Sequence, residues 1–190
     1  GVSLNKGMNE LKIPISAPEA KLWSVDDPNL YVCEVELSEG KNWVDKDSRR
    51  FGFRWFEASG IGEDAVFRLN GKRIMLRSAI SWRFWPVNGI FPSEELAEIR
   101  IAKELGLNML NFHRFIGNTD VMNYADELGL LYFEEPGGFR LDVRQPFMNA
   151  VLHEKVVRMV KRDRSNPCLV IYNMMNESGN AAPEKLALEI

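Results

Sequence analysis

The chain has 190 residues, of which 45% are hydrophobic and 27% are charged, and its formal net charge at pH 7 is -3. This composition is that of an ordinary globular protein and excludes a disordered or fibrous chain. The negative charge and the lack of a concentrated basic face argue against a nucleic-acid partner, and no apolar run approaches the roughly 18 residues of a membrane span.

The first part of the chain predicts β structure. Strands are expected at residues 11–15, 31–37 and 50–57, and the second of these alternates in places between apolar and polar residues, as a half-buried antiparallel strand does. Three strands are too few for a two-sheet sandwich, which commonly has about seven strands in about 100 residues. We therefore expect the last strands of a sandwich, followed by a domain boundary in the small and polar stretch 58–64.

A hairpin signal opens the second part of the chain. Asn70 and Gly71, the strongest short hairpin signal, separate expected strands at 65–69 and 73–77. From there strands and helices alternate. Helices are expected at 93–105, 120–128, 147–162 and after Pro183, with strands at 107–112, 130–133 and 168–172.

This alternation predicts an α/β fold with a parallel sheet and right-handed crossovers. A (β/α)8 TIM barrel needs roughly 250 residues, and the segment from Arg73 supplies about half of them. We expect the first half of such a barrel; a complete four-stranded doubly-wound domain is the alternative, disfavoured because neither end of the chain finishes a structural unit. In a halved barrel the strand that starts at Cys168 keeps an unpaired edge, through which two copies can associate.

Cysteine and histidine are too few and too scattered for a metal site. Cys33 and Cys168 lie far apart within apolar runs and are expected to be buried and reduced. The two histidines, His113 and His153, argue against a His-rich metal site. No metal and no cofactor is expected. The compartment stays open, because a signal peptide would lie upstream of a chain that starts within a domain.

The stretch from Arg162 to Gly179, RDRSNPCLVIYNMMNESG, carries the strongest functional signal. A charged helix end runs into a Ser-Asn-Pro turn, and the short apolar run that follows is typical of a strand buried on both faces. Asn176 and Glu177 come where this strand gives way to a loop. Because α/β proteins place their chemistry at the carboxyl ends of parallel strands, this amide and this carboxylate predict a site.

Five motifs follow one another along nearly the whole chain. They are Leu22-Trp23-Ser24 with Pro28-Asn29-Leu30-Tyr31, Arg50-Phe51-Gly52-Phe53-Arg54, Phe67-Arg68-Leu69-Asn70-Gly71-Lys72 with Leu76-Arg77, Leu128-Gly129-Leu130 with Glu134-Glu135, and Arg162-Asp163-Arg164-Ser165-Asn166-Pro167 with Asn176-Glu177-Ser178. In this order they resemble glycoside hydrolase family 2, the family of β-galactosidases, β-glucuronidases and β-mannosidases. The last motif is the most specific of the five.

The resemblance implies that residues 1–58 are the last strands of an immunoglobulin-like β-sandwich and residues 59–190 the first half of a catalytic TIM barrel. It also implies a retaining glycosidase that hydrolyses O-glycosidic bonds of β-glycosides, with a β-galactoside-like carbohydrate substrate. Glu177 matches the family's general acid/base, and Asn176 matches the neighbouring residue that contacts the sugar 2-hydroxyl. The nucleophile, a second carboxylate about 5–5.5 Å away, comes from the family's seventh barrel strand. That strand lies outside this chain, so the chain alone is expected to be inactive.

Three further residues at expected strand ends are candidates for substrate binding. Side chains alternate along a strand, so only one of Glu134 and Glu135 can face the mouth of a barrel, and we favour Glu135. The alternative is that the pair caps backbone amides or binds Arg114. His113 and Arg114 end the preceding strand, where they can reach a sugar or a carboxylate; the alternative is a salt bridge that supports the strand ends.

Departures from the family pattern leave the identity of the substrate open. The arginine and histidine that family β-galactosidases and β-glucuronidases carry after the second strand are Asn111 and Arg114 here, and the family's Asn-Arg-His-Glu becomes Ser-Trp-Arg-Phe at 81–84. The Glu-x-His metal pair of some β-galactosidases is absent. These differences support a second hypothesis, a catalytically silent carbohydrate-binding or structural module. A third, an unrelated doubly-wound binding domain, lacks a Gly-rich phosphate loop.

Overall fold

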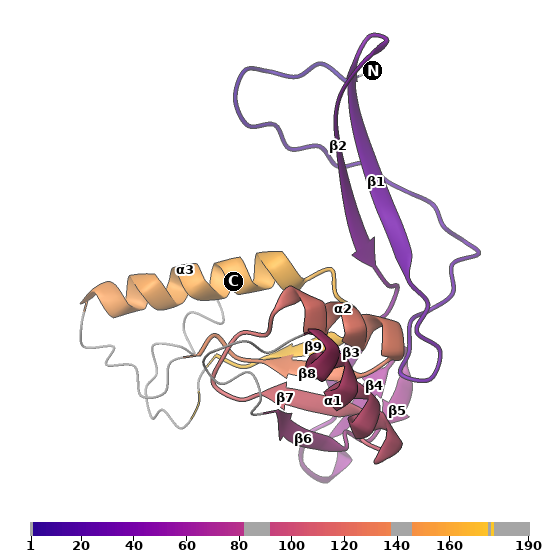
Figure 1. Cartoon of the computed structure of the whole chain (residues 1–190), viewed down its shortest axis with the longest axis vertical. Helices are drawn as coiled ribbons and strands as arrows, with labels where there is room; N and C mark the ends of the chain where they lie inside the picture. Colours follow the sequence, from indigo (N-terminus) through magenta and orange to yellow (C-terminus); the bar gives the residue numbers. More distant parts are fainter. Residues whose placement is uncertain (1, 82–91, 138–145, 175, 177–190) are drawn as a thin grey trace.

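The computed structural model describes residues 2–81, 92–137, 146–174 and 176, and Figure 1 shows how their helices and strands are arranged. A long two-stranded hairpin projects from one side of the molecule. The described residues after Phe51 form an α/β part with a three-stranded sheet, a four-stranded sheet and three α-helices. The expected order, β structure followed by alternating strands and helices, is therefore confirmed.

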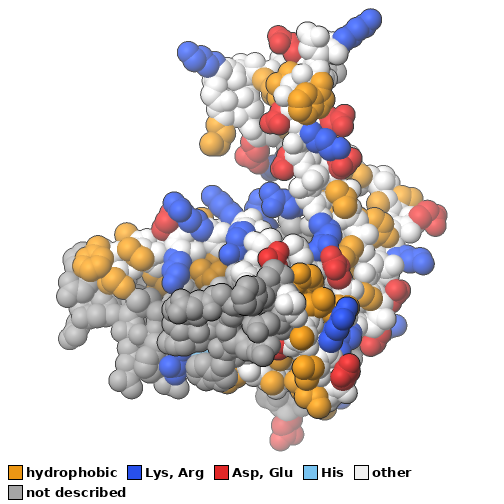
Figure 2. All heavy atoms as spheres, viewed as in Figure 1, with side chains coloured by type: hydrophobic (Ala, Val, Ile, Leu, Met, Phe, Trp, Pro, Cys, Tyr) orange, Lys and Arg blue, Asp and Glu red, His pale blue; other side chains and the backbone are white. Residues whose placement is uncertain are grey.

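The projecting hairpin pairs β1 (Tyr31–Glu39) with β2 (Asn42–Phe51) in antiparallel register. The strand expected at 31–37 is confirmed and is two residues longer at its end. The sequence does not predict β2 before residue 50, because the segment is mostly polar and exposed along nearly its whole length. Apolar side chains of this hairpin, Trp43 among them, remain exposed, and orange side chains lie on the projecting part in Figure 2.

Two of the early strand predictions are wrong. Residues 11–15 lie in no strand and are exposed, and Pro14 within them has no N–H to donate to a neighbouring strand. The strand expected at 50–57 is interrupted, because β2 ends at Phe51 and β3 begins only at Phe56. The alternation of apolar and polar residues therefore does not predict where the chain passes from one sheet to the next.

Close packing around Gly52 accounts for that interruption. A Cβ at Gly52 would lie 2.9 Å from side-chain atoms of both Trp23 and Pro167, so the backbone passes tightly between these two side chains. The Arg54 side chain then donates to the carbonyl oxygens of Pro167, at 2.9 Å, and Leu169. Residues 52–55 therefore dock against the start of the last described strand and continue neither β2 nor β3, although Phe53 forms an isolated bridge with Leu22.

The three-stranded antiparallel sheet contains β3 (Phe56–Ser59), β4 (Val66–Leu69) and β5 (Lys72–Ile74), in that order. The hairpin predicted at Asn70 and Gly71 is confirmed, and φ values of 54° and 76° give the turn the left-handed backbone that such hairpins require. The boundary stretch 58–64 holds the end of β3 and a short 3-10 helix, η1 (Gly62–Asp64). The division into residues 1–58 and 59–190 stays a prediction.

The four-stranded sheet is parallel throughout. Its strands are β6 (Ser78–Ser81), β7 (Met109–Phe112), β8 (Leu131–Glu134) and β9 (Leu169–Tyr172), and their spatial order follows the chain. This confirms the predicted parallel sheet and its three later strands. No reversal of strand order, as in a doubly-wound sheet, occurs within these four described strands.

The strand expected at 73–77 is wrong beyond residue 74, because residues 75–77 lie in no strand. β5 ends at Ile74, and β6 begins at Ser78. Asn108 holds the segment between them, since its side chain accepts the backbone N–H of Arg77 at 2.7 Å and donates to the carbonyl oxygen of Met75 at 2.9 Å. A contact between residues so far apart in the chain leaves no trace in local periodicity.

The three α-helices of the described residues lie where the sequence predicts them. They are α1 (Pro92–Glu104), α2 (Thr119–Leu128) and α3 (Pro146–Asp163). The Asn118 side chain caps α2 by accepting the backbone N–H of Val121 at 3.0 Å. None of the described helices is long and apolar enough to cross a membrane. The helix expected after Pro183 lies outside the described residues.

One face of the parallel sheet is packed, and the other is half open. Phe112 and Tyr132 stack with their ring centroids 4.3 Å apart, fully buried in the same core as Trp23. Because side chains alternate along each strand, Ile80 and Asn111, which lie in register, face the other way. Ile80 is 47% exposed. In the described part β9 pairs with β8 alone, which leaves the expected open edge.

Gly129 and Gly106 offer a matched test of packing at two helix ends. Both have left-handed backbone, with φ of 71° and 78°, where a Cβ costs about 1–2 kcal/mol. A Cβ at Gly129 would also lie 2.4 Å from the carbonyl oxygen of Val25, whereas one at Gly106 would meet nothing within 4 Å. We expect Gly129→Ala to lower the free energy of unfolding in urea clearly more than Gly106→Ala. Equal losses would contradict the tight contact with Val25.

Candidate active site

The carboxyl ends of β7, β8 and β9 lie at one edge of the parallel sheet, and Glu135 connects them. Glu135 follows β8 directly and is 3% exposed. Its Oε2 accepts the backbone N–H of Arg114, after β7, at 2.8 Å, and its Oε1 accepts the side-chain amide of Asn173, after β9, at 3.1 Å. The structure thus brings together two of the residues that the sequence selects, Glu135 and Arg114.

Arg114 has a left-handed backbone, with φ of 69°, which is uncommon for a residue with a side chain. Glu135 holds its N–H, and Gly137 lies so close that a Cβ there would be 2.8 Å from the carbonyl oxygen of Arg114. His113, the preceding residue, is half-buried. Since strained backbone that its surroundings maintain is concentrated at functional sites, this turn is a candidate for substrate contact.

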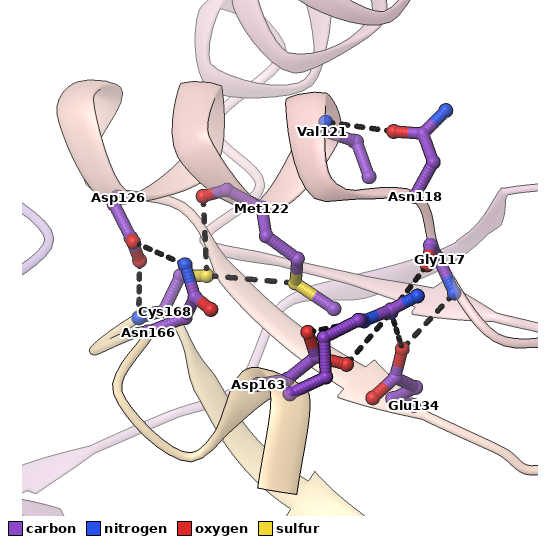
Figure 3. A network of polar contacts seen from close by, with 10 residues as sticks. Gly117, Asn118, Val121, Met122, Asp126, Glu134, Asp163, Asn166 and Cys168 are labelled. Atoms are coloured by element: carbon purple, nitrogen blue, oxygen red, sulfur yellow. Dashed lines mark hydrogen bonds and ion pairs between the residues drawn. The ribbon is translucent and has the colours of Figure 1, made fainter. Parts of the chain in front are cut away.

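Glu134 is fully buried, and alternation places its side chain on the opposite face of the sheet from Glu135. Its Oε1 accepts the backbone N–H of Gly117 at 3.0 Å, and the guanidinium of Arg162 contacts the same oxygen at 3.4 Å. Arg162 also donates to the carbonyl oxygen of Gly117 and, at 2.6 and 2.7 Å, to the two carboxylate oxygens of Asp163. Figure 3 shows how Gly117, Glu134 and Asp163 converge.

The surroundings of Glu134 set the pKa of its carboxyl group. Burial, together with the negative charge of Asp163, raises the pKa of Glu134 to about 9, and the positive charge of Arg162 only partly opposes the rise. Glu134 therefore carries a proton at neutral pH. The guanidinium of Arg162 supplies the positive charge beside both acidic side chains.

The sequence anticipates part of this arrangement. The two glutamates alternate as predicted, and the alternative weighed for them is also observed, since both accept backbone N–H groups. Contact of Glu135 with a sugar stays a prediction. The link from Glu134 to Arg162 and Asp163 is missed, because it joins residues 28 and 29 positions apart. The only available signal is the Arg-Asp pair at an expected helix end.

Two amide side chains at the strand ends have a buried atom without a hydrogen-bond partner among the described residues. The atoms are Oδ1 of Asn111, on the half-open face of β7, and Nδ2 of Asn176, beyond β9. An unpaired buried polar atom is unfavourable, so both are suited to bind a polar ligand group. Glu177 lies outside the described residues, and its acid/base role stays a prediction, as does sugar binding by Asn176.

A second buried network fixes the turn that leads into β9 (Figure 3). Asp126 of α2 is 1% exposed and accepts the backbone N–H of Cys168 at 2.9 Å and the side-chain amide of Asn166 at 2.7 Å. Burial raises the pKa of Asp126, and these hydrogen bonds oppose the rise. The Ser-Asn-Pro segment therefore anchors the start of the strand that leads to Asn176.

Both cysteines are free and Cys168 is buried, as predicted, but the expected burial of Cys33 is wrong, because Cys33 is only half-buried on the projecting hairpin. Burial, reinforced by Asp126, raises the pKa of the Cys168 thiol, which disfavours the reactive thiolate form. Within the described ranges no group of three or more His, Cys, Asp and Glu side chains could hold a metal ion. The expectation of no metal and no cofactor stays a prediction.

Comparisons with known proteins identify the relatives of this chain. The family model for glycosyl hydrolases family 2 matches residues 2–54. A β-galactosidase of Thermoanaerobacterium thermosulfurigenes is 32% identical over 165 residues, which are 84% of this chain and 22% of that protein. The resemblance to glycoside hydrolase family 2 is confirmed. The match to this β-galactosidase extends into the α/β part, beyond the segment that the family model covers.

Two further relatives carry the name of a different β-glycosidase. A protein named as a putative β-glucuronidase of Formosa agariphila is 28% identical over 159 residues, 83% of this chain and 19% of its own length. The crystal structure of the Parabacteroides merdae β-glucuronidase superposes with a TM-score of 0.67 at 27% identity, over 83% of this chain and 19% of that one. The chain therefore spans about a fifth of the length of these two relatives.

Proposed function

We propose that this chain is part of a retaining glycoside hydrolase that cleaves O-glycosidic bonds of β-glycosides, with a β-galactoside-like substrate. The observation that carries the proposal is the similarity over more than four-fifths of the chain to proteins named β-galactosidase and β-glucuronidase. The cluster of polar side chains at the carboxyl ends of β7, β8 and β9 supports it, since parallel α/β enzymes place their sites there.

The finer fold belongs to the same proposal. Residues 1–58 would be the last strands of an immunoglobulin-like sandwich, and residues 59–190 the first half of a TIM barrel. Four parallel strands in chain order, with one packed face and one half-open face, are what the first half of a barrel requires. The open edge of β9 would then meet the remaining barrel strands in the full-length protein or, in the isolated segment, a second copy.

Glu177 is the proposed general acid/base, and Asn176 the proposed ligand of the sugar 2-hydroxyl. In the first step Glu177 donates its proton to the leaving oxygen while a nucleophilic carboxylate forms a glycosyl-enzyme. In the second step Glu177 takes a proton from the water that releases the sugar. The nucleophile lies outside this chain, so both steps belong to the full-length protein.

Glu135, His113 and Arg114 are the proposed substrate-binding residues. Glu135 reaches all three strand ends, and its position beside Arg114 and Asn173 allows it to accept a sugar hydroxyl as well. His113 and Arg114 place a ring nitrogen and a guanidinium at the end of β7, where donors can bind hydroxyl or carboxylate oxygens.

A catalytically silent carbohydrate-binding or structural module is the second candidate. Asn111 supports it, because an amide stands where family β-galactosidases and β-glucuronidases carry an arginine, and its buried Oδ1 has no partner among the described residues. Such a module would bind sugar without cleaving it. Nucleic acid and membrane remain unexpected as partners.

The deciding experiment uses the full-length protein and 4-nitrophenyl β-glycosides of galactose, glucuronic acid and mannose. We expect hydrolysis of the galactoside, with a β-configured sugar as the first product in the NMR spectrum, because two displacements at the anomeric carbon retain its configuration. An α-configured first product would contradict the retaining mechanism. Binding of the sugars without any hydrolysis would favour the silent module.

A further inference from the structure

The loop after β7, residues 113–117, is held from two sides by adjacent glutamates. Glu135 accepts the N–H of Arg114 near the beginning of the loop, and Glu134 accepts the N–H of Gly117 at its end. Arg162, at the end of α3, donates to the carbonyl oxygen of the same glycine. Both backbone polar groups of Gly117 are therefore bound by side chains, the N–H by the buried Glu134 and the carbonyl oxygen by the partly exposed Arg162.

The loop can occupy this position because residue 117 has no side chain. A Cβ at Gly117 would lie 2.3 Å from the ring of Phe112, which is itself stacked on Tyr132. The end of the loop thus rests directly on the buried core and has no room to shift toward it. Its position is then decided by the hydrogen bonds to Glu134 and Arg162.

We propose that Glu134, Arg162 and Asp163 form a clamp that positions the loop 113–117, and through it the side chains of His113 and Arg114, at the substrate edge of the sheet. Its members are positioning residues, since none of the three is proposed to touch the sugar. The catalytic consequence rests on the proposed function, because only there do His113 and Arg114 bind substrate. The structural consequence, a fixed loop, does not depend on it.

The charges of the clamp predict which substitutions it tolerates. Asp163 is 1% exposed and receives two hydrogen bonds from Arg162, so it holds the guanidinium in place. Glu134 carries a proton, because burial and Asp163 raise its pKa. Tyr172 lies opposite Glu134 in the register of β8 and β9, and neither it nor the nearby Cys168 adds positive charge. A neutral glutamine of the same shape can therefore accept the N–H of Gly117, whereas alanine cannot.

The test compares Glu134→Gln, Glu134→Ala and Arg162→Gln in the full-length protein. We expect Glu134→Gln to keep kcat/KM within about threefold, and Glu134→Ala and Arg162→Gln to lower it by up to about 100-fold, as a displacement of about 1 Å can. KM should rise more than kcat falls, because the displaced residues bind substrate. Glu154→Gln is the control, since Glu154 is an exposed α3 residue paired with Arg158.

Hydrogen exchange of the peptide containing residues 113–117 is measured on the same variants. We expect faster exchange in Glu134→Ala and Arg162→Gln, and unchanged exchange in Glu134→Gln and Glu154→Gln. If the wild-type protein hydrolyses no glycoside, the proposed function fails. The exchange data alone then show whether the clamp fixes the loop 113–117. If exchange and KM are the same in all four variants, the clamp is wrong and the proposed function stands. If Glu134→Ala does not fold, Arg162→Gln tests the clamp instead. The Arg162 side chain is 40% exposed, so its replacement leaves the buried core in place.

Discussion

Replacing Glu177 with glutamine is expected to lower kcat/KM of the full-length protein for alkyl β-glycosides by about 10²–10⁴-fold, the usual contribution of general acid–base catalysis. Glutamine preserves the shape of the side chain and its capacity for hydrogen bonding but has no proton to give to the leaving oxygen. An alkoxide leaving group needs that proton, because it is a strong base. Steady-state kinetics on methyl and aryl β-galactosides measure the effect.

The leaving group separates proton donation from a general disturbance of the site. A dinitrophenolate departs without help, so the glycosylation rate of the Glu177→Gln variant should approach that of the wild type on dinitrophenyl β-galactoside, while the methyl glycoside stays slow. Glu154→Gln, on the exposed side of α3, should leave both substrates unaffected. An equal loss on both substrates would show that Glu177 does not act as the acid.

The α/β part could be predicted because its signals are local. The helices α1, α2 and α3 each carry apolar residues at helical spacing. Ile99, Val121 and Val156 belong to these three sets, and all three are fully buried in the structure. Gly129 ends α2 with left-handed backbone, as a glycine after a periodic apolar stretch predicts. Each of these features depends on residues within one or two turns of each other, so the sequence is sufficient to find them.

The strands in the first part of the chain are harder to predict, because they form by pairing with a neighbouring strand and not by burying an apolar face. β2 is polar and exposed for most of its length, and it forms a strand because β1 pairs with it. Residues 11–15 look more like a strand, but they pair with no described segment and form no strand. A hairpin that projects from the molecule lacks the buried face on which alternation depends.

The candidate site also has features that local sequence predicts and features that it does not. Alternation along β8 separates Glu134 from Glu135 and follows from the sequence alone. That Gly117 lies over Phe112, and that Arg162 returns to Gly117 from the end of α3, are consequences of packing between elements far apart in the chain. The sequence therefore names residues of the strand ends but misses the contacts that hold their loop.

Trp23 connects the front segment to the α/β part, and Trp23→Ala is expected to have the largest effect on stability. Its indole is fully buried, and Nε1 donates to the backbone carbonyl of Asp126 at 2.8 Å. The backbone carbonyl oxygen of Trp23 accepts a hydrogen bond from the side-chain amide of Asn70 at 2.9 Å. The backbone N–H of Trp23 donates to the carbonyl oxygen of Phe53 at 2.8 Å. One residue thus packs against or bonds to α2, the β4–β5 hairpin and the segment after β2.

We expect Trp23→Ala to lower the free energy of unfolding by about 3–5 kcal/mol, because a large buried side chain is lost and a cavity remains. The carbonyl oxygen of Asp126 also loses its donor, which adds to the loss. Trp43→Ala is the matched control; Trp43 is 66% exposed on β2, and its loss should change stability by no more than about 0.5 kcal/mol. Urea unfolding followed by circular dichroism compares the two. Similar losses would mean that Trp23 does not join the two parts of the chain, and that the segment before β3 is held by the contacts of Arg54 instead.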